Sequence, residues 1–322
     1  MRSIIHGDIL ILGYGPVGKA TAAALAGRPV RIAQRHRPAD LPTDIGFVAC
    51  DVLNRDSVLA AAQGAAQIVL AIGLPYSAKN WRSDWPLAMS NVLAAAQAHK
   101  ARLIFVDNLY MYGPQTAALH EEMPLQDYGA KPAVRAQITR MWMAAHEKGQ
   151  VKATALRAPD FYGPNVTQQS TLGEMALAKL AQGQKPFLFM NPDQPHAFAY
   201  VPDIARAVVS LLDAPDEDYG QAWHIPCAPI QTPRQILALG AAILQQPLVI
   251  STLPMWLWPV IGLFVPVLAE VVEMRFQWDR PYEVESSKFK QRFWSDATPF
   301  EQGVAATLRS FASDKSKAKI VA

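Results

Sequence analysis

Residues Asp8–Ala20 read "DILILGYGPVGKA", an apolar run followed at once by three closely spaced glycines and an alanine-rich stretch. Gly13, Gly15 and Gly18 have the spacing G-x-G-x-x-G. Between a strand and a helix, such glycines permit a tight turn and let the backbone approach a pyrophosphate at the helix N-terminus. The stretch therefore predicts the first strand–turn–helix unit of a sheet that binds a dinucleotide, with a merely structural turn as the alternative.

The residues that follow alternate between apolar, strand-like runs and helical patterns. Strands are expected at "PVRIAQ", "GFVAC", "QIVLAIG", "RLIFVDN" and "VKATALRA", and helices over 86–99 and from about Pro132. Continuous apolar strands between helices indicate a parallel sheet covered on both faces. We therefore predict an α/β, doubly wound dinucleotide-binding domain over residues 1–165. Residues 166–322 should form mainly a smaller substrate-binding lobe, with 197–226 returning to the first domain.

Composition limits the kinds of partner. The chain has 322 residues, 51% of them hydrophobic, and a net charge of only +3, with basic residues scattered among acidic ones. This balance argues against nucleic acid and favours a small-molecule substrate. Cys50 and Cys227 are the only cysteines, and the seven histidines show no metal spacing, so we predict neither a disulfide framework nor a metal site. The N-terminus leads directly into a strand, which favours a cytoplasmic protein; a homodimer is left open.

One apolar segment, "LPMWLWPVIGLFVPVLA" (Leu253–Ala269), resembles a membrane segment. It is shorter than the roughly 20 apolar residues that span a bilayer, and three prolines interrupt it. We therefore favour short buried helices and expect no membrane contact. The alternative is a segment that lies on a membrane surface and attaches there through Trp256 and Trp258.

The second expected strand indicates which dinucleotide is preferred. An NAD site usually has an acidic residue at the end of that strand, where this chain reads "AQRHR" (33–37) and has no acid before Asp40. The planar guanidinium of Arg35 suits a 2′-phosphate, so NADP is preferred and NAD remains an option; an ordinary charged loop is the alternative. Asp51 could border the adenine or cap the next helix.

Several motifs together resemble the extended short-chain dehydrogenase/reductases, the NAD-dependent epimerase/dehydratase group. They are "LGYGPVG", "ACDVLNRDSV", "VLAIG", "FVDNLYMYGP", "LRAPDFYGP" and "HAFAYVPDIARAVV", and the resemblance runs from Ile9 to about Pro226. It implies a Rossmann domain, a substrate lobe and a bound nicotinamide cofactor. The implied cofactor contacts are Gly13, Tyr14, Gly15, Pro16, Val17, Gly18, Arg35, Asp51, Val52, Ala71, Gly73, Asn108 and Pro159.

Catalysis in that family uses a serine or threonine, a tyrosine, and a lysine four residues after the tyrosine. The lysine lowers the pKa of the tyrosine, so the phenolate can exchange a proton with a substrate hydroxyl. Here Asn108 stands at the serine position, and alignment on Pro124 places Lys131 and Arg135 at the tyrosine and lysine positions. Tyr128 lies three residues early. The chain therefore resembles an atypical member.

The stretch "QDYGAKPAVR" (126–135) holds three of these candidate catalytic residues. Lys131 and Arg135 are four apart at an expected helix start, so both should project to one side, where the helix N-terminus adds positive charge. They could form an anion clamp, act in proton transfer, or merely decorate an exposed helix start. Tyr128 is a candidate phenol in the preceding loop, and Tyr110 is a second one.

The substrate side has its own candidates. Open α/β sheets place ligands at the carboxyl ends of strands, where Arg157 and Asp160 lie; a structural tie between these two side chains is the alternative. The resemblance implies that residues 159–162 border the nicotinamide. His196 is a candidate acid–base residue because histidine titrates near neutrality; bonding to the backbone is the common alternative. The expected substrate contacts are Tyr110, Asp160, Phe161 and His196.

The sequence thus predicts an NAD(P)-dependent oxidoreductase or epimerase/dehydratase-type enzyme with an atypical active site. Its substrate should be small, oxygenated and anionic, because the cationic pair Lys131 and Arg135 suits a carboxylate or phosphate. The alternative is a catalytically silent NADP-binding sensor or assembly protein, which the missing serine, tyrosine and lysine would favour.

Overall fold

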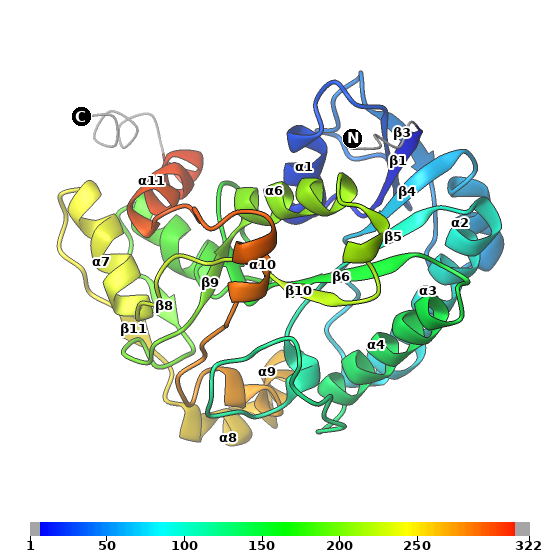
Figure 1. Ribbon diagram of the computed structural model, residues 1–322. Coiled ribbons are helices and arrows are strands. Elements are labelled where there is room, and N and C mark those ends of the chain that lie inside the picture. Colours follow the sequence, from blue (N-terminus) through cyan, green and yellow to red (C-terminus); the bar gives the residue numbers. More distant parts are fainter. Residues whose placement is uncertain (1–6, 313–322) are drawn as a thin grey trace. The chain divides into compact units, whose positions relative to one another are not determined.

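The computed structural model describes residues 7–312, which fall into two compact units (Figure 1). Unit 1 holds the chain up to Gly113, then Glu121–Arg157 and Ile204–His224. Unit 2 holds Pro114–His120, Ala158–Asp203 and the chain from Ile225 onward. The chain therefore crosses between the units more than once.

Unit 1 is built on a seven-stranded sheet in the order β10-β6-β5-β4-β1-β2-β3, with parallel pairing throughout. This arrangement confirms the expected doubly wound α/β sheet, and the strand order reverses between β1 and β4, where such sheets bind ligands. The elements are β1 (Asp8–Leu12), α1 (Pro16–Ala24), β2 (Val30–Gln34), β3 (Gly46–Ala49), α2 (Arg55–Ala61), β4 (Ala65–Leu70), α3 (Ala78–His99), β5 (Arg102–Asp107), η1 (Tyr110–Tyr112), α4 (Lys131–Glu147), β6 (Ala153–Arg157), α6 (Val201–Leu212), η3 (Asp216–Asp218) and β10 (Ala222–His224).

Alternate strand residues pack on opposite faces of this sheet, because successive side chains of a strand point to opposite sides. One face forms a buried cluster with α2, α3 and α4, and its strand members include Leu10, Leu12, Ile68, Leu70, Leu103 and Phe105. On the other face, a Cβ added to Gly18 of α1 would lie 3.6 Å from the Ile11 side chain. The continuous apolar strands of the sequence are thus explained by helices on both sides.

Helix α3 differs from expectation at its start. It begins at Ala78, eight residues before the expected Pro86, which lies inside it. Two buried indoles hold the added turns: Trp81 donates its Nε1–H to the carbonyl of Pro75 at 3.0 Å, and Trp85 is 1% exposed. Burial of these rings outweighs the hydrogen bond that Pro86 cannot make.

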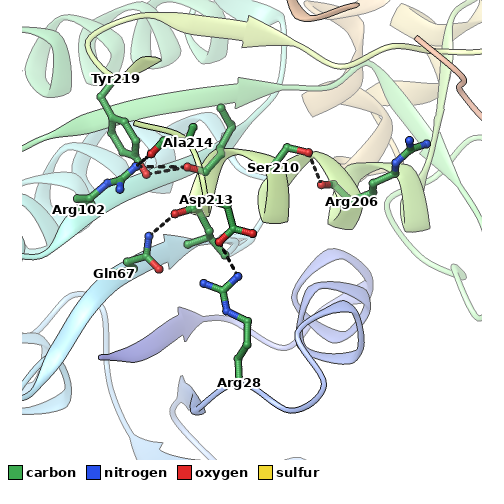
Figure 2. A network of polar contacts seen from close by, with 10 residues as sticks. Arg28, Gln67, Arg102, Arg206, Ser210, Asp213, Ala214 and Tyr219 are labelled. Carbon is green, nitrogen blue, oxygen red and sulfur yellow. Dashed lines mark hydrogen bonds and ion pairs between the residues drawn. The ribbon is translucent and has the colours of Figure 1, made fainter. Parts of the chain in front are cut away.

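A polar network attaches the end of α6 to the sheet (Figure 2). Gln67 of β4 donates to the carbonyl of Leu212 at 2.7 Å, and Arg102 of β5 donates to the carbonyl of Ala214 at 2.5 Å. The Arg102 guanidinium also lies 4.0 Å from the ring centroid of Tyr219. Carbonyls at a helix C-terminus have no partner within the helix, so these side chains satisfy them and fix the returning segment on unit 1.

Unit 2 contains shorter elements. They are β7 (Asp160–Tyr162), η2 (Gly173–Ala178), α5 (Lys179–Ala181), β8 (Phe187–Leu188), β9 (Phe198–Tyr200), α7 (Pro233–Ile243), β11 (Ser251–Thr252), η4 (Met255–Leu257), α8 (Trp258–Gly262), α9 (Pro266–Val272), η5 (Arg275–Gln277), α10 (Ser287–Arg292) and α11 (Phe300–Phe311). Strand β7 pairs with β9, and β8 with β11, both in parallel. Strand β7 and its partner β9 belong to unit 2, which holds 158–203, and unit 1 resumes over 204–224. The domain limits expected from the sequence, 165 and 197–226, stay predictions.

The apolar segment Leu253–Ala269 is not the buried pair of helices that its sequence favours. Trp258 is fully buried, but Trp256 is 74% exposed and Phe264 is 82% exposed. The expectation of burial is therefore wrong for most of the segment. Among residues 7–312, no helix has both the length and the hydropathy to cross a membrane.

Candidate active site

The glycine-rich loop after β1 has the geometry of a dinucleotide cradle. Gly13 has φ +99°, and a Cβ there would lie 2.6 Å from the carbonyl oxygen of Ala71. A Cβ on Gly18 would lie 2.2 Å from the Gly13 oxygen, whereas one on Gly15 would meet nothing within 4 Å. Protein packing thus requires Gly13 and Gly18, while the open space at Gly15 leaves room for a ligand to approach the backbone. The loop fits the pyrophosphate of a nicotinamide dinucleotide.

The end of β2 contributes a neutral side chain to this loop. Gln34 accepts a hydrogen bond from the Tyr14 backbone N–H at 3.1 Å, and its own amide donates to the carbonyl of His36 at 2.9 Å. Arg35 follows with an exposed side chain, and Lys19 forms an exposed ion pair with Asp40. A glutamine therefore occupies the place where NAD sites usually carry an acid, and sequence reasoning overlooked it as a contact of the glycine loop.

The other expected cofactor residues of unit 1 follow the neighbouring strands. Ala71 and Gly73 come directly after β4, beside Gly13. Asp51, after β3, accepts from the Leu53 backbone N–H at 3.0 Å, and Val52 is half-buried. The cap of α2 is Asn54, whose side chain accepts from Ser57 N at 2.9 Å, so the alternative that Asp51 caps this helix is wrong. Pro16 and Val17 open α1 and are half-buried.

Three neighbouring strands place polar residues side by side at their carboxyl ends. Asp107 ends β5, Arg157 ends β6 and His224 ends β10. The strand register pairs Asp107 with Arg157 and Arg157 with His224. All three are at least 95% buried. Charged and titratable groups thus line one edge of the sheet, where ligands of open α/β sheets bind.

Arg135 of α4 completes a buried ion pair at this edge. Its Nη1 donates to Asp107 Oδ1 at 2.9 Å, with side chains 6% and 0% exposed. The guanidinium lies 3.8 Å from the ring centroid of Trp85 and 4.8 Å from that of Trp81. Burial raises the pKa of the Asp107 carboxyl, while the charges of Arg135 and Arg157 act to lower it. Arg135 is therefore fixed by an anion and two aromatic rings.

Lys131 is the first residue of α4 and is fully buried. Its Nζ lies 4.7 Å from the ring centroid of Tyr76. Lys131 and Arg135 both contact aromatic residues of the segment around α3, as residues four apart on one helix face should. The alternative that they decorate an exposed helix start is wrong, because those aromatic rings cover them.

The remaining candidates in this region differ in exposure. Tyr128 lies in the loop before α4 and is 44% exposed. Asn108 is half-buried, and its Oδ1 accepts from the Tyr110 backbone N–H at 3.0 Å. The Tyr110 ring stacks on Trp81, with centroids 6.2 Å apart. The amide oxygen of Asn108 is thus engaged by a backbone N–H two residues further along the chain.

A second buried network was not anticipated from the sequence. Arg157 donates to the hydroxyl of Tyr112 and, at 3.4 Å, to Thr139 Oγ1. The Tyr112 hydroxyl lies 2.8 Å from His224 Nε2, and burial raises the pKa of Tyr112 to about 12. Glu121 accepts from the His224 backbone N–H at 2.8 Å. The sequence could have identified Asp107 and His224 as site residues, because each is the last residue of an apolar strand. No sequence pattern marks Tyr112 in this way.

In unit 2, Asp160 and His196 form the centre of a polar cluster. His196 Nε2 lies 3.0 Å from Asp160 Oδ2, and the same oxygen accepts from Trp278 Nε1 at 3.1 Å. His196 is 1% exposed and stacks on Tyr282 with ring centroids 5.0 Å apart. Its backbone N–H also donates to the carbonyl of Gln231, and the role of its imidazole stays a prediction. Pro159 is buried, and Phe161 of β7 is half-buried.

Comparisons with known proteins agree with this geometry. Residues 9–225 match the model of the "NAD dependent epimerase/dehydratase family", which confirms the resemblance seen in the motifs. No curated protein matches the chain.

Solved structures share the fold. UDP-glucuronic acid 4-epimerase from Bacillus cereus, in complex with NAD, superposes with a TM-score of 0.77 at 16% identity, covering 94% of this chain and 98% of that one. dTDP-glucose 4,6-dehydratase from Bacillus anthracis, also with NAD, has a TM-score of 0.75 at 16% identity, covering 95% and 96%. At such identities the likeness shows the fold, whereas the family match covers most of the sequence. The chain belongs to the NAD-dependent epimerase/dehydratase family of enzymes.

Proposed function

We propose that the protein is an NAD(P)-dependent enzyme of epimerase/dehydratase type that acts on a small, oxygenated, anionic substrate through an atypical acid–base residue, Lys131. One observation carries this proposal: a lysine buried at the start of α4 lies one turn from the buried pair of Arg135 and Asp107. In the resembling enzymes this helix start supplies the tyrosine and lysine. An ammonium there can give a proton to a substrate oxygen and take it back.

The loop of Gly13, Gly15 and Gly18 would hold the pyrophosphate, with Ala71 and Gly73 beside it. When bound, the nicotinamide supplies a hydride acceptor or donor. Preference for NADP over NAD is supported by Gln34, which is uncharged and does not repel a phosphate, and by the exposed guanidinium of Arg35.

The charge balance at the strand ends supports an anionic substrate. Arg135 and Arg157 lie with two carboxylates, those of Asp107 and Glu121, and Lys131, on the same helix as Arg135, adds a third basic side chain. Buried charges are stabilised by a partner of opposite sign, so a substrate carboxylate or phosphate would complete the balance. Arg135 acts in this proposal as a positioning residue, because Asp107 and the indoles already hold it.

Other candidates keep supporting roles in the proposal. The amide nitrogen of Asn108 would orient the substrate oxygen, since its amide oxygen is bonded to Tyr110 N. Tyr110 and Tyr128 in unit 1, and Asp160, Phe161 and His196 in unit 2, stay predicted substrate contacts. A cytoplasmic location and a homodimer stay predictions.

The test of catalysis uses NADPH deuterated at its transferable position, incubated with the protein and a small-metabolite extract. An oxidoreductase should place deuterium in one oxygenated, anionic compound, which mass spectrometry detects. An epimerase returns the hydride to its own substrate, so it should convert one such compound into an isomer without adding label. Lys131→Met should abolish the transfer while NADPH still binds, because only the acid–base group is lost. The matched control is Lys148→Met, which removes an exposed lysine at the end of the same helix. Full transfer by Lys131→Met would refute the role of this residue.

Cofactor preference needs its own test. Arg35→Ala should weaken NADPH binding about tenfold or more and leave NADH binding unchanged, since a charge-assisted contact to phosphate contributes roughly 1.5–3 kcal/mol. Arg55→Ala, another exposed arginine, is the control. Titration calorimetry reports both affinities, and equal losses for the two cofactors would contradict a 2′-phosphate contact.

A catalytically silent NADP-binding sensor is the second candidate. It is favoured by the local use of the Asn108 amide oxygen and by the pairing of Arg135 with Asp107, which leave Lys131 without the usual catalytic companions. In that case NADPH would bind, no metabolite would gain deuterium, and Lys131→Met would change nothing in the cofactor titration.

A further inference from the structure

We propose that unit 2 carries a membrane-contact site, formed by the turn between α8 and α9, which inserts its apolar side chains into the surface of a lipid bilayer. The contact segment is Leu253–Pro266, and its most exposed side chains are those of Trp256, Val260, Leu263, Phe264 and Val265. Leu263 and Phe264, at the turn, are 79% and 82% exposed. This site is independent of the proposed catalytic function.

The packing of unit 2 holds the contact segment at the surface, because one buried side chain, that of Trp258, fixes its position. Trp258 is fully buried, with its ring centroid 5.8 Å from that of Phe189 and 5.9 Å from that of Trp278. Gly262 lies against α9, where an added Cβ would approach the Ala269 backbone to 3.2 Å. The two short helices are therefore packed together, and the apolar side chains at their turn point away from that packing.

The backbone of the contact segment suits an apolar medium. Phe264 N and Val265 N both donate to the carbonyl of Ile261 at 2.9 Å, and Leu263 N donates to that of Val260 at 3.3 Å. Pro259 is the second residue of α8 and Pro266 the first of α9, and neither brings an N–H group. In hydrocarbon an N–H without a partner costs several kcal/mol. A turn whose donors are satisfied internally avoids that cost on insertion.

The chemistry of the segment indicates lipid rather than a second copy of the chain. Residues 253–269 contain no charged residue or histidine, and Trp256 has the amphipathic ring that is enriched at membrane interfaces. A stable protein interface takes roughly 20–30 residues from each side, with a polar rim. The contact segment runs over only 253–266. Shallow insertion of one turn needs no larger area.

The test is flotation of the full chain with phosphatidylcholine vesicles. The protein should float with these vesicles, in 0.5 M salt as well as at low salt, because the segment is uncharged. Leu263→Ser with Phe264→Ser should reduce the bound fraction at least tenfold. Val249→Ser, which changes another exposed apolar residue of unit 2, should bind as the unmodified chain does. Unchanged unfolding temperatures would show that all variants are folded.

Trp256 supplies a second readout, because it is the tryptophan with a strongly exposed side chain. Vesicles should protect it from iodide quenching, and Trp256→Phe should remove the protected signal. Absence of flotation would refute the proposal. So would binding that needs anionic lipid and disappears in salt, or a dimer that Leu263→Ser with Phe264→Ser dissociates while no variant floats.

Discussion

At the scale of single residues, two buried tyrosines differ in what their hydroxyl groups contact. The Tyr112 hydroxyl accepts from Arg157 and lies 2.8 Å from His224 Nε2, whereas the buried Tyr162 hydroxyl has no hydrogen-bond partner among residues 7–312. Removing one partner of a buried hydrogen bond costs about 1–3 kcal/mol, but removing an unsatisfied group does not.

We therefore predict opposite effects of the same substitution. Tyr112→Phe should lower the free energy of unfolding by about 1–3 kcal/mol, since it leaves Arg157 and His224 without that hydroxyl. Tyr162→Phe should be neutral or stabilising by up to about 1 kcal/mol. Urea denaturation at pH 7 measures both, and equal losses would contradict the difference between the two sites.

Tyr112 also predicts a pH dependence. Its pKa is raised by burial to about 12, so the folded chain holds the phenolic proton more tightly than the unfolded chain, whose tyrosines titrate near 10. The resulting stability is full below about pH 10 and is lost as the pH rises toward 12, at most about 2–3 kcal/mol. Urea denaturation at pH 8, 10 and 11 should show a shallower loss for Tyr112→Phe; parallel curves would refute this assignment.

For single residues, the sequence predicted which side chains share a helix face, but not which side chains surround them. The four-residue interval between Lys131 and Arg135 correctly placed both on one helix face. Their burial under Tyr76, Trp81 and Trp85 follows from α3, which begins earlier than its proline suggests. The roles of the candidate residues stay predictions until the labelled-hydride experiment.

At the scale of elements, helix α11 lies close to strand β7. A Cβ added to Gly303 of α11 would lie 2.3 Å from the hydroxyl of Tyr162 and 3.0 Å from its Cζ. Alanine normally favours a helix over glycine by about 1 kcal/mol. Here the clash should outweigh that gain, because overpacking a buried contact costs about 1–3 kcal/mol.

Gly303→Ala should therefore lower the unfolding temperature. Adding Tyr162→Phe removes the nearest atom and should restore part of the loss. Ala305→Gly changes a half-buried position of the same helix and measures how much the difference in helix propensity between alanine and glycine alone changes the unfolding temperature. Differential scanning calorimetry of the three variants and the double variant would decide; the absence of any rescue would place the clash elsewhere.

Element boundaries show why periodicity alone was insufficient. Strands β1 to β6 lie where continuous apolar runs indicated them, since burial on both faces leaves a clear pattern. The segment around α8 reads as equally apolar, yet apart from the buried Trp258 its large side chains include the strongly exposed Trp256, Leu263 and Phe264. An apolar sequence indicates that its side chains favour leaving water. It does not indicate whether other residues of the same chain will bury them.

At the scale of the whole molecule, the first unit is assembled from separated pieces of sequence. Residues 204–224 supply most of α6 and the edge strand β10, and Gln67 and Arg102 bond carbonyls of that returning segment. The motif "YVPDIARA" led us to predict a return to the first domain, but the limits of such a return depend on strand pairing that no local pattern encodes.

Truncation tests this assembly. A chain ending at 224 should retain NADPH binding, because it contains every element of unit 1. A chain ending at 203 should lose it and aggregate, since the edge of β6 and the side chains of Gln67 and Arg102 would be left without partners. Titration calorimetry and size-exclusion chromatography compare the two. Equal binding by both would refute the need for the returning segment.

The late position of β10 in the sequence has a consequence for synthesis on the ribosome. Strand β6 is complete at Arg157, but its partner is complete only at His224, and at about 5–20 residues per second the interval lasts roughly 3–13 s. Throughout that time the nascent sheet has an open hydrogen-bonding edge beside β6. An open strand edge favours pairing with other chains, so we expect brief chaperone occupancy to begin once Arg157 has left the ribosomal exit tunnel and to end once His224 has left it.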